Sequence, residues 1–98
     1  MKIAVIGDSD TVLAFRLAGL ESRVARFAAE VPALIEQLRR EDMGLMLITE
    51  ALVEENRELV EKILLEPGGP LILEIPEFKG PMTHKTGATQ RIAALLRR

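Results

Sequence analysis

KIAVIGDSDTVLAFRLAGL, at residues 2–20, is the segment from which the architecture of this chain follows. Its first part, KIAVI, is a continuous apolar run that ends at Gly7, which is typical of a parallel strand covered on both faces. Residues 11–19 then indicate a short helix that ends at Gly19. A strand that leads through a tight turn into a helix is the repeating unit of an α/β fold.

The turn between this strand and helix lies where many α/β proteins bind phosphate. A dinucleotide or phosphate loop needs repeated glycines, or glycines followed by Lys and Ser or Thr. This turn offers Gly7 and two acids, Asp8 and Asp10, which place negative charge where an anion would bind. We therefore predict a helix cap, in which Ser9 or Asp10 accepts a hydrogen bond from the first turn. Ligand binding at this turn stays open as the alternative.

The rest of the chain repeats the strand and helix pattern. An edge strand is expected within residues 22–28, and further strands at residues 43–49 and 71–76. Helices are expected at residues 30–41, 51–66 and 88–98. This order predicts a small, doubly wound, four-stranded parallel sheet with right-handed crossovers and helices on both faces, a Rossmann-like or receiver-like topology.

We expect one α/β domain over residues 1–98, because no linker or repeat divides the chain. Residues 86–98 include a C-terminal amphipathic helix that we treat as a candidate mobile segment. Residues 77–87 form a loop longer than most connections in such folds, and loops of this length often carry function.

Composition excludes several classes of function. The chain of 98 residues has a net charge of -2 and no Trp or Tyr, which argues against nucleic acid binding. It has no cysteine, so thiolate catalysis and disulfide frameworks are excluded. The first apolar run is too short for a signal peptide or a membrane span. We expect a cytoplasmic protein with no direct membrane insertion.

Acids after the first strand are also found in receiver domains, where they hold magnesium beside a phosphorylated aspartate at the end of the third strand. Here that strand ends in Thr49 and Glu50, and threonine cannot form an acyl phosphate. The fifth receiver strand, with its lysine, has no room in this chain. We predict that Thr49 caps the following helix. A degenerate receiver-like signalling domain, or a small-ligand binder at the carboxyl edge of the sheet, remains the alternative function.

Residues suited to catalysis or metal binding are scarce. His84 is the only histidine, and one histidine without cysteines or spaced acids does not make a zinc site. No serine is placed beside it as a nucleophile. We predict no catalytic residue, cofactor site or metal site, and we look instead for a binding surface.

Three segments resemble the F subunit of the vacuolar and archaeal-type rotary ATPases, including the bacterial members. These segments are GDSDTVLAFRLAGL, LMLITEALVEENRELVEKIL and ILEIPEFKGP, of which FRLAG at residues 15–19 is the most specific. The sequence departs from the family at Ala14, where many members have glycine. It also ends with RIAALLRR, where some relatives run on, which leaves any role of a longer tail in doubt.

The resemblance implies a non-catalytic protein of the central stalk, or rotor. Such a protein is held by the coiled coil of the D subunit and turns inside the ring of catalytic A and B subunits. It implies a C-terminal segment that reaches toward that ring and a part in coupling ATP hydrolysis or synthesis to rotation and ion transport. It also implies a location peripheral to the membrane, in the soluble sector of the complex.

We predict partner contacts in three parts of the chain, namely the first helix, the loop after the fourth strand and the last helix. The side chain of Phe15 fits the core equally well. The predicted positions are Phe15, Arg16, Ile75, Pro76, Glu77, Phe78, Lys79, Gly80, Pro81, Arg91, Ile92 and Leu95.

Overall fold

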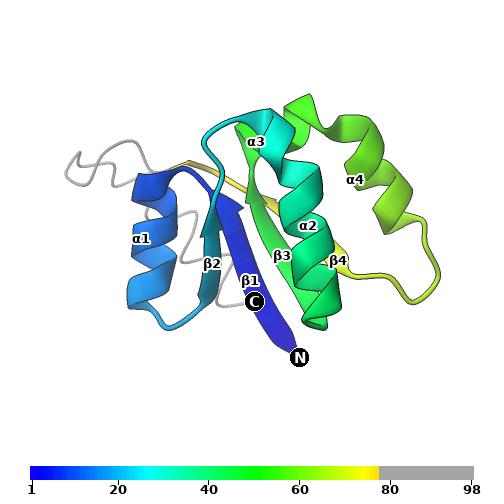
Figure 1. Ribbon diagram of the computed structural model, residues 1–98, viewed down its shortest axis with the longest axis horizontal. Helices are drawn as coiled ribbons and strands as arrows, with labels where there is room; N and C mark the ends of the chain where they lie inside the picture. Colours follow the sequence, from blue (N-terminus) through cyan, green and yellow to red (C-terminus); the bar gives the residue numbers. More distant parts are fainter. Residues whose placement is uncertain (78–98) are drawn as a thin grey trace.

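The computed structural model describes residues 1–77 of the chain. Within them, four strands form one parallel sheet in the order β2-β1-β3-β4 (Figure 1). The strands are β1 (Lys2–Gly7), β2 (Glu21–Val24), β3 (Met43–Thr49) and β4 (Leu71–Ile75). The predicted α/β class, the parallel sheet and the edge position of the second strand are confirmed.

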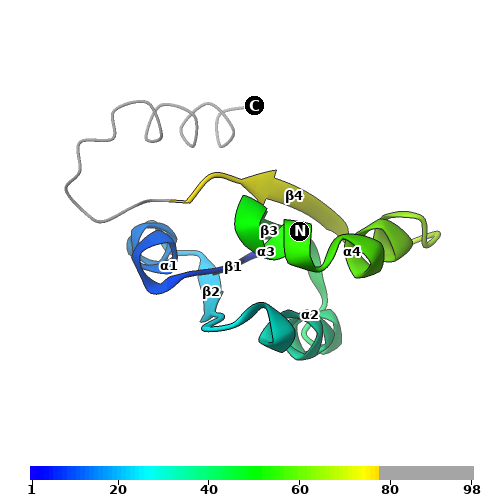
Figure 2. The same cartoon turned by 90° about the horizontal axis from the view of Figure 1, so that it is seen from above.

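Helices cover both faces of this sheet, as the doubly wound prediction requires (Figure 2). On one face lies α1 (Ser9–Leu17), and on the other lie α2 (Val31–Arg40), α3 (Glu50–Glu55) and α4 (Arg57–Leu64). A single 3-10 turn, η1 (Ala28–Glu30), leads into α2. The predicted helix at residues 88–98 lies outside the described residues.

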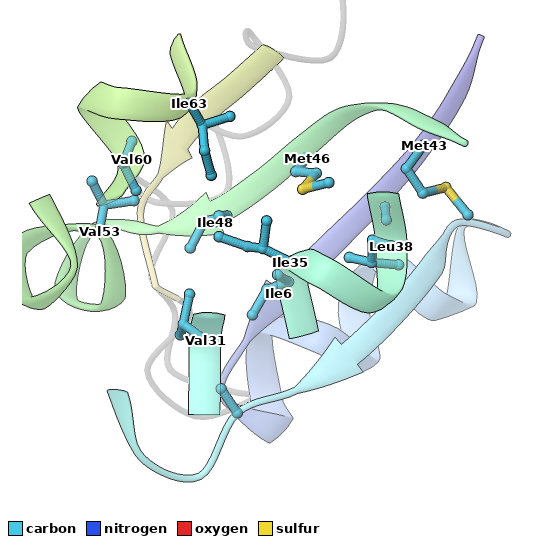
Figure 3. Packing of buried hydrophobic residues seen from close by; sticks show 12 residues of the cluster. Ile6, Val31, Ile35, Leu38, Met43, Met46, Ile48, Val53, Val60 and Ile63 are labelled. Carbon is cyan, nitrogen blue, oxygen red and sulfur yellow. The ribbon is translucent and has the colours of Figure 1, made fainter. Parts of the chain in front are cut away.

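Two apolar clusters fill the space between the sheet and its helices, because successive side chains of a strand point to opposite faces. The larger cluster joins β1 and β3 to α2, α3 and α4, and Figure 3 shows its side chains converging from these elements. The smaller cluster lies beneath α1 and contains Val5, Val12, Phe15, Leu47 and Ile75.

Helix α1 is fixed at both ends, although the predicted cap was wrong. Asp8, not Ser9 or Asp10, is the N-cap, because the helix already begins at Ser9. The extended backbone of Asp8 directs its carboxylate to the Thr11 amide, at 3.2 Å, and to the Thr11 hydroxyl, at 2.7 Å. At the other end, Gly19 has a φ of 90° and closes a Schellman motif, in which Leu20 N donates to Phe15 O.

The helix predicted at residues 51–66 is wrong as one element, since the structure breaks it at Asn56 into α3 and α4. The side-chain amide of Asn56 donates to Leu52 O, at 3.0 Å, and to Ala28 O, at 3.1 Å. An asparagine that bonds nearby carbonyls competes with the backbone bonds of a continuous helix. The same two bonds tie α3 to the turn that precedes α2.

Candidate functional site

The carboxyl ends of the strands bring together the residues that the sequence marks as a possible ligand site. This edge is where parallel α/β sheets usually bind small molecules. It contains Asp8 after β1, Thr49 and Glu50 at the end of β3, and Glu77 after β4. Whether they form a site depends on how their polar groups are already used.

The polar groups of the turn between β1 and α1 are already used in contacts within the chain. Both carboxylate oxygens of Asp8 accept hydrogen bonds from Thr11, and the carbonyl of Gly7 accepts one from Ala25 N at 2.9 Å. The Asp8 carboxylate therefore occupies the α1 N-terminus where a bound anion would otherwise interact with the helix dipole.

The end of β3 packs closely against this turn. A Cβ atom placed on Gly7 would lie 2.8 Å from Thr49 Cγ2, so the methyl group of Thr49 fills the space that glycine leaves. Thr49 is 1% exposed, and its side chain makes no capping bond to α3. The predicted capping role of Thr49 is therefore wrong, because the close contact with Gly7 fixes this side chain inside the fold.

Helix α3 takes a side-chain cap from a distant part of the chain. The amide of Ala51, in the first turn of α3, donates to Glu77 Oε2 at 3.0 Å. The strand register explains this contact. Thr49 on β3 pairs with Ile75 on β4, and Ala51 and Glu77 each lie two residues beyond that pair. Sequence reasoning placed Glu77 among partner contacts and did not find this role, because capping signals are read from residues adjacent to the helix.

No group of three or more His, Cys, Asp or Glu side chains within residues 1–77 is arranged to hold a metal ion. A hollow of about 600 Å³ lies at the opposite, amino edge of the sheet, where Lys2, Arg40 and Asp42 line it. Beside it, Arg23 pairs with Glu21 and Glu41, and the hydrogen bonds to these two carboxylates raise the pKa of its guanidinium. The charges around the hollow are mixed in sign.

Predicted partner residues divide by burial. Phe15 and Ile75 are 2% and 1% exposed in the smaller cluster, and Pro76 is also buried, so these three contribute to the core. Arg16 is exposed and donates from Nε to Ser22 Oγ at 3.1 Å, and Glu77 is partly exposed. The other predicted positions lie outside the described residues, namely Phe78, Lys79, Gly80, Pro81, Arg91, Ile92 and Leu95.

Exposed apolar side chains that the prediction did not include offer further contact surface. Leu13 and Leu17 on α1 are 51% and 80% exposed, and Leu71 and Leu73 on β4 are 57% and 40% exposed. The signal for the α1 pair was in the sequence, since Leu13 and Leu17 lie four residues apart and off the face of Val12 and Phe15. Clustered exposed leucines commonly mark protein contacts.

The comparisons with known proteins agree with one another. The family described as ATP synthase (F/14-kDa) subunit matches residues 3–92. The F subunit of the A-type ATP synthase of Methanothermobacter thermautotrophicus is 38% identical over 86% of this chain and 80% of its own length. The F subunit of the A-type ATP synthase of Thermococcus kodakarensis is 44% identical over 82% of this chain and 78% of its own length. The F subunit of the V-type ATP synthase of Fusobacterium nucleatum is 35% identical over 83% of this chain and 76% of its own length. Among the described residues, no helix has the length and apolar character needed to span a bilayer.

Proposed function

This chain belongs to the family of the ATP synthase (F/14-kDa) subunit, and on that premise we propose that it is a non-catalytic rotor subunit of an A/V-type rotary ATPase. In this proposal it sits on the central stalk, bound to the coiled coil of the D subunit. It transmits rotation between ATP chemistry and ion transport through contacts. It acts in the cytoplasm, in the soluble sector of the complex and peripheral to the membrane.

The family match is the observation that carries this proposal, and the carboxyl edge supports its non-catalytic part. A binding turn needs polar groups that are available to a ligand. In this edge the Asp8 carboxylate and the Gly7 carbonyl serve the fold, and Thr49 is buried against Gly7. The receiver-like alternative loses support for the same reason, because the position of its phosphorylated residue is occupied by a buried threonine.

The partner surface that we propose combines exposed residues of the described fold with the C-terminal segment. From the described part it takes Arg16, Glu77 and the leucine pair Leu13 and Leu17. From the sequence beyond it we keep Phe78, Lys79, Gly80, Pro81, Arg91, Ile92 and Leu95 as proposed contacts. We assign residues 86–98 the contact with the A/B ring.

The proposal is tested by co-expressing a tagged copy of the chain with the stalk coiled-coil subunit of the same genome. Size exclusion with light scattering should show a stable one-to-one complex. A lone monomer beside a soluble and folded coiled-coil subunit would overturn the stalk assignment. Incubation with magnesium and a small phosphodonor, followed by mass measurement, should leave the mass unchanged, and an adduct on Glu50 would favour the receiver-like alternative.

The contact surface has its own prediction. Leu13→Asp with Leu17→Asp places two charges in the proposed interface, and we expect the affinity for the coiled-coil subunit to fall at least about ten-fold, since hot-spot residues typically contribute more than about 1 kcal/mol each. Ala33→Asp on the exposed side of α2 is the matched control and should leave binding unchanged. Equal affinity of both variants and the parent would remove α1 from the interface.

A further inference from the structure

The contact between Glu77 and α3 joins two parts of the molecule that are far apart in sequence. Glu77 is the last described residue after β4, and Ala51 is the second residue of α3, so the bond connects the exit of the last strand to the start of a helix. A carboxylate that accepts from a helix N-terminal amide is favoured by both the hydrogen bond and the helix dipole.

The residues on either side of this bond are held firmly. Ile75 is 1% exposed and pairs with Thr49, and Pro76 is buried with its φ fixed by the ring. Glu77 is thus the first position after β4 whose side chain has access to solvent. At the other end of α3, the side-chain amide of Asn56 bonds to Leu52 O and to Ala28 O, which links the helix to η1.

We propose that Glu77 is a clasp that couples the chain beyond residue 77 to helix α3. While the clasp is closed, α3 keeps its side-chain cap and the chain leaves the sheet from a fixed point. Any contact that draws residue 77 outward breaks the bond to Ala51 and removes that cap. The loosened helix then affects Asn56 and its bond to η1. The clasp is a property of the isolated chain and does not depend on the stalk assignment.

Nuclear magnetic resonance tests the clasp on the full chain. In Glu77→Ala, we expect the Ala51 amide signal to shift and its hydrogen exchange to become about five-fold faster, in line with the loss of a typical cap. Asn56 is the only asparagine of the chain, so its side-chain amide gives a separate reporter at the far end of α3, and we expect its signals to shift as well.

Two further variants make the result specific. Glu77→Gln keeps an acceptor oxygen without the charge, and hydrogen exchange of its Ala51 amide should be faster than in the parent and slower than in Glu77→Ala. Glu74→Ala removes a carboxylate on β4 that pairs with Arg57, and it should leave the Ala51 amide unchanged. An Ala51 amide that behaves alike in the parent and in Glu77→Ala would overturn the proposal, and so would an equal change in Glu74→Ala.

Limited trypsin digestion gives a second readout. Cleavage after Lys79 requires the neighbouring chain, residue 77 included, to enter the protease in an extended form, so its rate reports opening of the clasp. Lys85 lies farther along and serves as the internal reference. We expect Glu77→Ala to raise cleavage after Lys79 about five-fold relative to cleavage after Lys85. An unchanged ratio would contradict the clasp while leaving the test for the coiled-coil complex untouched.

Discussion

The two faces of the sheet differ in how completely their apolar side chains are covered. On the face of α2, α3 and α4, the side chains of Ile6 and Ile48 are fully buried. On the face of α1, Phe15 is buried, whereas Leu71 and Leu73 on β4 stay 57% and 40% exposed. Strand β4 has apolar side chains on both faces, so the difference arises from the covering elements. The first face mainly stabilises the fold, and the second keeps apolar surface that suits contact with a partner.

The largest expected effect is the difference in stability loss between a buried and an exposed side chain on the α1 face. Phe15→Ala removes a buried aromatic ring and should lower the free energy of unfolding by about 4 kcal/mol. Leu71→Ala, at an exposed position, should change it by less than about 0.5 kcal/mol. Chemical denaturation followed by circular dichroism measures both, because the chain has no Trp or Tyr. Equal losses would mean that β4 is covered as fully as the core.

A smaller effect is expected at the cap of α1, the only helix that packs on this face among the described residues. Asp8→Ala removes the bonds to the amide and hydroxyl of Thr11 and should cost about 1 kcal/mol of stability. Ser9→Ala is the control, since Ser9 lies inside the helix and should cost little. The same denaturation experiment measures both variants. A larger stability loss for Ser9→Ala than for Asp8→Ala would indicate that Ser9, one of the two residues predicted from the sequence, is the N-cap.

The smallest effect is expected at an ion pair on the opposite face. The hydrogen bond from Arg39, at 2.7 Å, holds the pKa of Glu66 below its ordinary value of 4.5. A lowered pKa means that the pair stabilises the fold above pH 4.5 and that this contribution is lost as the pH falls below it. The contribution is small, because both side chains are partly exposed.

This pH dependence is measured by comparing the parent with Glu66→Gln. We expect the parent to melt at a slightly higher temperature at neutral pH, and the difference to shrink as the pH falls through and below 4.5. A difference that stays constant over this range would show that the ion pair is not its source.

The order of elements could be predicted because it depends on local periodicity. Buried strands such as residues 43–49 are apolar throughout, and helix α2 has apolar residues at helical spacing. The end of α1 was equally readable, since Gly19 adopts a positive φ that few other residues tolerate. The fold class follows from the same local patterns, whereas the family resemblance rests on the three segments quoted for it.

The errors have physical causes that local patterns do not carry. Asp8, Ser9 and Asp10 are all good N-caps, so composition alone could not choose among them. The apolar spacing continues across Asn56, and its side-chain bonds to Leu52 O and to the distant Ala28 O show why the helix breaks there. The cap of α3 comes from Glu77, which lies 26 residues after Ala51 in the sequence. The break at Asn56 and the cap from Glu77 depend on contacts between residues far apart in the sequence, whereas the choice of Asp8 depends on where α1 begins.

The contact between Gly7 and Thr49 has a consequence for how this fold can change over evolution. Any side chain at residue 7 would bring its Cβ to 2.8 Å from the Thr49 methyl, so the two positions must change together. Serine at residue 49 would remove that methyl group and make room for alanine at residue 7. A descendant of this chain with any side chain at residue 7 would therefore need a compensating substitution on β3, and mutations confined to the first loop would not be enough.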